Sequence, residues 1–112
     1  MTNNQAKEIN KTAVLELLSK AGQLLKDGQF IEALGCYDRV VQLEKENHEA
    51  FFGLYMSWWN WRRIYKSWDL EIERYFDNSI RYAPLEKQKE YNKIWNENSA
   101  IFSKEGNSDE QK

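Results

Sequence analysis

Turn-forming residues are scarce in this chain, which holds five glycines and one proline among 112 residues. All-β folds need many turns, so this scarcity argues against them and favours helices. A single cysteine, Cys36, excludes an internal disulfide framework. No apolar run approaches the roughly eighteen residues of a membrane-spanning helix. Basic residues number 16 and acidic residues 18, so we expect neither nucleic acid nor an anionic membrane as the partner.

Further absences narrow the function classes. The first residues lack the apolar segment of a signal peptide, and with the single cysteine this predicts a cytoplasmic protein. His48 is the only histidine, which excludes a metal site built from His and Cys. Carboxylate pairs such as Glu71 and Glu73 do not share a helical face, and no glycine-rich phosphate loop is present. We therefore expect no enzyme, no catalytic residue, no metal and no cofactor.

Apolar periodicity divides the chain into five predicted helices, at about 11–26, 29–45, 48–65, 70–83 and 85–103. Within each range, apolar residues recur three and four positions apart, which is the spacing of one helical face. Gly28 ends the first helix, Asn47 can cap the third, and Pro84 ends the fourth. Short connections make consecutive helices antiparallel neighbours, so the predicted fold class is all-α.

Polar segments flank this helical region. Residues 1–9 are expected to be a flexible N-terminus. Residues 104–112 lack apolar periodicity and are expected to be a disordered tail. The sequence therefore predicts one helical domain at 10–103, a size that suits a single core.

An internal repeat relates the first four helices. The first pair carries a large residue, a small one and a leucine, then an alanine and an aromatic: Leu17, Ala21, Leu24, Ala33 and Tyr37. This spacing resembles the tetratricopeptide repeat, and Phe51 follows Leu17 by 34 residues, the repeat length of that family. After an insertion within 63–68, Ile72, Phe76 and Pro84 match the second helix of a second unit. The resemblance implies two helix pairs in an α-α superhelix, closed by the helix at 85–103.

A second apolar stripe lies about 100° around the first and third helices from their core faces. In the tetratricopeptide family these helices line a concave groove that binds a protein or peptide. The resemblance therefore places eight residues in one groove: Leu15, Leu18, Gly22, Leu25, Phe52, Met56, Trp59 and Arg63. We expect at least Trp59 to be partly exposed. Some family members use groove Lys and Asn to clamp a carboxylate, but Leu18 and Gly22 stand at those places, so that function is not expected.

The stripe is open to other interpretations. It can be a contact between copies of the chain, or internal packing covered by the last helix. Aromatic and basic residues also interleave from Trp59 to Lys66, as in binders of single-stranded nucleic acid, but acidic neighbours and the net charge of −2 argue against that partner. We interpret the chain as a non-enzymatic protein-interaction module, such as an adaptor or scaffold. The alternatives are a structural homodimer or oligomer and, more distantly, a nucleic-acid-binding adaptor.

Overall fold

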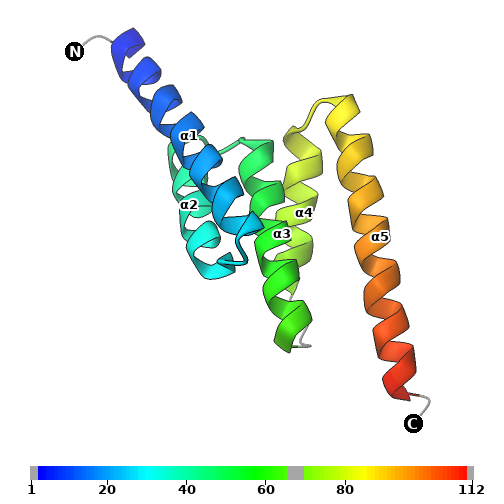
Figure 1. Cartoon of the computed structure of the whole chain (residues 1–112). Coiled ribbons are helices and arrows are strands. Elements are labelled where there is room, and N and C mark those ends of the chain that lie inside the picture. Colours follow the sequence, from blue (N-terminus) through cyan, green and yellow to red (C-terminus); the bar gives the residue numbers. More distant parts are fainter. Residues whose placement is uncertain (1–2, 66–69, 111–112) are drawn as a thin grey trace.

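Five helices make up the part of the chain that the structure describes. The computed structural model describes residues 3–65 and 70–110, with side chains described at 7–62 and 71–101. The helices are α1 (Asn3–Lys26), α2 (Phe30–Leu43), α3 (His48–Tyr65), α4 (Leu70–Tyr82) and α5 (Leu85–Glu110), and these ranges contain no strand (Figure 1). The predicted all-α fold class and the number of helices are confirmed.

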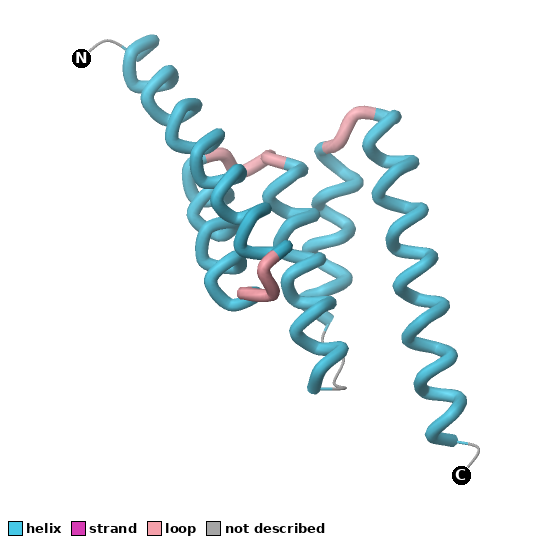
Figure 2. The backbone as a smooth tube through the Cα atoms, viewed as in Figure 1, coloured by secondary structure: helices cyan, strands magenta, loops and turns pink. Residues whose placement is uncertain are grey.

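Consecutive helices run in opposite directions, and short loops join those whose connection is described (Figure 2). The closest packing is between α1 and α2, between α2 and α3, and between α3 and α4. The pairs α1–α3 and α4–α5 approach less closely along their backbones. The result is an elongated molecule with extents of 64 × 29 × 20 Å, in which α1 and α5 lie at opposite ends (Figure 1).

Local interactions end the helices at the predicted places. Gly28 has a φ of 79°, and the N–H groups of Gly28 and Gln29 donate to the carbonyls of Leu25 and Leu24. These two hydrogen bonds satisfy carbonyl groups in the last turn of α1, and the positive φ favours glycine. Asn47 caps α3, because its Oδ1 accepts the backbone N–H of Ala50 at 2.9 Å.

Two hydrophobic clusters share α3. The first joins α1, α2 and α3 around residues that include Ala21, Ala33 and Leu54, and both alanines are fully buried. The second joins α3, α4 and α5 around residues that include Tyr55 and Ile72. Since α3 contributes to both clusters, two of its faces are covered within the chain.

The first and last helices are longer than the sequence predicted. α1 begins at Asn3 rather than near Lys11, and α5 continues to Glu110 rather than ending near residue 103. Apolar periodicity detects only the part of a helix that packs on a neighbour, whereas a helix once formed adds a backbone hydrogen bond with each further residue. Helix bounds do not measure motion, so the flexibility of 1–9 and the disorder of 104–112 stay predictions. Residues 1–2 and 111–112 lie outside the described residues.

None of the described helices combines the length and the apolar character that crossing a bilayer requires.

Candidate functional site

The half of the predicted groove that lies on α1 is open to solvent. Leu15 is 60% exposed, and Leu18, Gly22 and Leu25 are partly exposed. A Cβ built on Gly22 would meet no other atom within 4 Å, so nothing stands over the helix at that point. Leu18 and Leu25 pack with part of their surface against the first cluster. The stripe on α1 therefore combines anchored leucines with apolar surface that no other part of the described chain covers.

The half that lies on α3 is covered by α5. The rings of Phe52 and Tyr91 stack with centroids 4.0 Å apart. One turn further along α3, the Asn98 amide of α5 donates to the Tyr55 hydroxyl at 2.9 Å and lies 3.8 Å from the Met56 sulfur. Phe52 and Met56 are therefore only partly exposed. The sequence left this choice open, and on α3 internal packing accounts for much of the stripe.

Trp59 is buried, so its expected exposure is wrong. Its side chain is 3% exposed and belongs to the second cluster together with Phe76 and Tyr91. The physical reason is that α4 and α5 pack around the same part of α3, so the helices form a second layer that the helical wheel does not reveal. The backbone of Arg63 continues α3, but its side chain lies outside the described residues.

Side chains rather than close backbone approach hold α5 in place. The Tyr91 hydroxyl is hydrogen-bonded to His48 Nδ1 at 2.9 Å, and the Trp95 ring stacks on Phe76 with centroids 4.5 Å apart. Burial raises the pKa of Tyr91, and the nearby negative charge of Glu49 adds to this shift. The helix that closes the chain is thus fixed by aromatic rings and a few polar contacts on α3 and α4.

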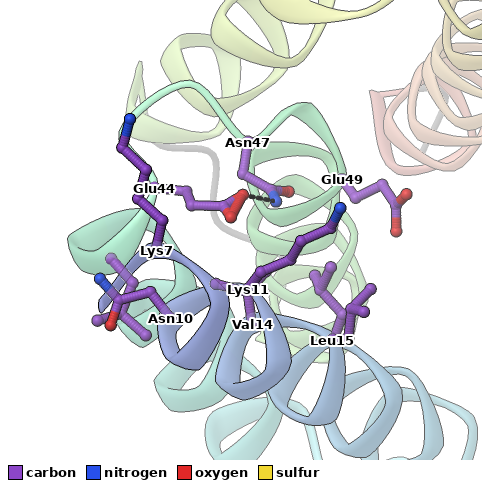
Figure 3. Close-up of a pocket in the computed structure, with 10 residues that line it drawn as sticks. Lys7, Asn10, Lys11, Val14, Leu15, Glu44, Asn47 and Glu49 are labelled. Carbon is purple, nitrogen blue, oxygen red and sulfur yellow. Dashed lines mark hydrogen bonds between the residues drawn. The ribbon is translucent and has the colours of Figure 1, made fainter. Parts of the chain in front are cut away.

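A pocket of about 390 Å³ adjoins the open stripe (Figure 3). It lies between the N-terminal half of α1 and the junction of α2 with α3. The first helix supplies one wall, made of Lys7, Asn10, Lys11, Val14, Leu15 and Leu18. The opposite wall comes from the end of α2 and the start of α3, through Leu43, Glu44, Asn47 and Glu49. Leu15 and Leu18 are the two predicted groove residues that line it.

The two walls carry opposite charges. Lys7 and Lys11 come from α1 and extend across the opening, whereas Glu44 and Glu49 come from the end of α2 and the start of α3 (Figure 3). The Asn47 amide, which already caps α3, donates to Glu44 Oε1 at 3.1 Å and so holds that carboxylate at the pocket. The arrangement can bind a surface-exposed segment that brings an apolar side chain and charges of both signs.

No three His, Cys, Asp or Glu side chains come together to hold a metal ion among the described residues. Cys36 is a partly buried free thiol on α2, beside a separate hollow of about 360 Å³ that shares no lining residue with the charged pocket. A lone thiol of this kind is usually a small packing residue.

The sequence missed most of the pocket residues, although one signal was present. Lys7, Lys11, Leu15 and Leu18 follow one another at spacings of three and four, which places them along one face of a single helix. This continuity extends the helical face of Leu15 and Leu18 back to Lys7, into the segment 1–9 that the sequence predicts to be flexible. The acidic wall had no comparable signal, because its residues meet α1 only through the packing of α2 and α3.

Comparison with known proteins gives no relative: no protein-family model, no curated protein and no solved structure matches this chain.

Proposed function

We propose that this chain is a non-enzymatic protein-interaction module of the tetratricopeptide-repeat type, and that the pocket face of α1 binds a segment of a partner protein. The observation that carries the proposal is the exposed apolar stripe of α1 beside a pocket that this stripe helps to line. Scattered exposed leucines are ordinary, but one that borders a pocket beside a second, partly exposed leucine is typical of a binding surface. A cytoplasmic location, expected from the sequence, remains part of this proposal.

The helix arrangement supports the repeat assignment. Two helix pairs follow one another, and α5 packs on the second pair as a closing helix would. Ala21 and Ala33, the small residues of the first unit, are fully buried on the two helices that pack together. The turn at Gly28 and the break at Pro84 fall where the repeat pattern has them.

The binding energy available at this face is of a useful size. Complete burial of an exposed leucine side chain contributes about 1.5–3 kcal/mol to the free energy of binding. Leu15 and Leu18 can each contribute a part of this amount when a partner covers their exposed surface. Leu18 already packs against the first cluster, so it loses little conformational entropy when a partner binds. Such a surface suits a modest, reversible interaction with a protein segment.

The test is selection from a random peptide library displayed on phage, with the purified full chain as bait. We expect enriched peptides whose binding is lost in Leu15→Asp. Ile31→Asp is a matched control, because Ile31 is 58% exposed, close to the 60% of Leu15, but does not line the pocket. Enriched peptides that bind Leu15→Asp as well as the wild type, or no enrichment at all, would contradict the proposal.

A homodimer is the second candidate. The N-terminal half of α1 extends beyond α2 (Figure 1), and it carries the exposed apolar side chains of Ile9 and Leu15. Sedimentation of the full chain separates the two functions. A dimer that Leu15→Asp converts to a monomer would show that a second copy, rather than a different protein, covers this face.

A further inference from the structure

We infer that the pocket between α1 and the start of α3 selects a partner segment of mixed charge. This segment carries an apolar side chain with an acidic residue toward α1 and a basic residue toward α3. The inference rests on the proposed function and names the chemistry of its partner. Four features support it: the apolar floor, the two charged walls, the absence of ion pairs between the walls, and the exposure of the lining.

The floor of the pocket is apolar and is built from the core. Val14 is buried, and Leu18 and Leu43 are partly buried against the first cluster. The exposed Leu15 stands at the edge. A volume of about 390 Å³ is at the lower end of the range for ligand pockets. The floor therefore suits one large or two small apolar side chains from a protein segment.

The basic wall is a pair of lysines on one face of α1. Lys7 and Lys11 are four residues apart, which places them one helical turn from each other. Both side chains are exposed and line the pocket. Two neighbouring ammonium groups repel each other slightly, so a carboxylate of the partner placed between them is favourable.

The acidic wall stands opposite and is anchored by the cap of α3. Glu44 accepts a hydrogen bond from Asn47, and Glu49 is exposed in the first turn of α3. Among the described side chains, no ion pair joins Lys7 or Lys11 to either glutamate. The charged groups of both walls can therefore form ion pairs with a partner, because they do not pair with each other.

This pattern favours a peptide over other ligands. A nucleic acid would be attracted by the lysines but repelled by Glu44 and Glu49, and like charges brought together at an interface are unfavourable. A small molecule usually has most of its surface enclosed, whereas Lys7, Asn10 and Leu15 leave much of this lining exposed. A protein segment lying across the opening satisfies both walls and the floor at once.

The test reads charge directly from the library selection. Against the wild type, we expect enriched peptides that carry an acidic and a basic residue on either side of an apolar one. The same library is selected against the double variant Lys7→Glu/Lys11→Glu. There we expect the acidic position to be replaced by Lys or Arg, while the apolar position is kept.

A charge exchange gives the quantitative form of the test. In a synthetic peptide from the wild-type selection, replacing the acidic residue by Lys should weaken binding about threefold to tenfold, the scale of one or two exposed ion pairs. The variant Lys7→Glu/Lys11→Glu should restore the affinity for this altered peptide. The control Lys89→Glu/Lys93→Glu has the same spacing and the same charge change on exposed positions of α5, away from the pocket, and should restore nothing.

Two results overturn the inference in different ways. Wild-type peptides without charge preference, whose binding Leu15→Asp abolishes, would leave the proposed function intact and remove its charge selectivity. A single-stranded oligonucleotide that binds the wild type more tightly than any selected peptide, and is lost in Lys7→Glu/Lys11→Glu, would replace the peptide by nucleic acid. Failure to enrich any peptide would instead overturn the proposed function itself.

Discussion

The ring of Phe52 on α3 lies within 10° of parallel to the ring of Tyr91 on α5, with the ring centroids 4.0 Å apart. This stack covers part of an apolar stripe on α3, whereas the matching stripe on α1 stays open to solvent. The last helix, α5, thus completes the second hydrophobic cluster, whereas the first helix, α1, presents the apolar surface that a partner can bind.

Two substitutions at Tyr91 separate the stack from the hydrogen bond. Tyr91→Phe keeps the ring and removes the bond to His48, which should lower the free energy of unfolding by about 0.5–1.5 kcal/mol. Tyr91→Ala removes the buried ring as well and should cost about 3 kcal/mol or more. Denaturant unfolding measures both. Equal losses for the two variants would show that the stack does not hold α5 on α3.

Trp59 is predicted to act in folding rather than in binding. Its side chain is buried in the second cluster, so Trp59→Ala should destabilise the chain by about 3–5 kcal/mol. Leu15→Asp, at an exposed position, should change stability by less than about 0.5 kcal/mol. Thermal and denaturant melts of the two variants decide the matter. A Trp59→Ala variant as stable as the wild type would show that Trp59 is not part of the core and would make it a candidate binding residue again.

Two glycines in helices should respond oppositely to alanine. A Cβ on Gly53 of α3 would collide with the ring of Tyr37 on α2, whereas one on Gly35 would meet nothing within 4 Å. Gly53→Ala should therefore lower stability by about 1–3 kcal/mol, because the buried Tyr37 ring must move. Gly35→Ala should raise it by about 0.5–1 kcal/mol through the higher helix propensity of alanine. If both substitutions raised stability, the ring of Tyr37 on α2 would not lie against Gly53 on α3.

Stability should fall in alkaline solution. Burial is the main cause that raises the pKa values of Tyr37, Tyr55 and Tyr91 above the ordinary 10.0. The unfolded chain then loses these protons before the folded one, so the stabilisation is complete below pH 10 and declines as the pH rises beyond it. Unfolding free energies measured across this range should decline with pH, and less steeply in Tyr91→Phe. If the unfolding free energy of Tyr91→Phe declined with pH as steeply as that of the wild type, ionisation of Tyr91 would not contribute to the loss of stability.

The sequence predicted those features that local chemistry determines. Helix ends at Gly28 and Pro84, the cap at Asn47 and the buried pair Ala21 and Ala33 all follow from short-range rules of backbone conformation and helical spacing. The open stripe on α1 was also predicted, because Leu15 and Leu18 lie off the core face of their own helix.

What the sequence did not predict depends on long-range packing. A helical wheel shows that Phe52 and Trp59 lie on a second apolar face, but not that α5 turns back over it. The acidic wall at Glu44 and Glu49 likewise meets Lys7 only after α2 places the start of α3 beside α1. Such contacts join residues far apart in the chain, and no periodicity records them.

The most direct test of the central claim is a map of amide chemical shifts in the labelled full chain, recorded by nuclear magnetic resonance as a selected peptide is added. Binding at the pocket predicts the largest shifts at residues 7–18 of α1 and at 43–49, with little change from Tyr91 to Asn98 on α5. Peptide-dependent shifts centred on α5 and on Phe52 would contradict the account, because they would show that the partner displaces the last helix and binds the stripe of α3 instead.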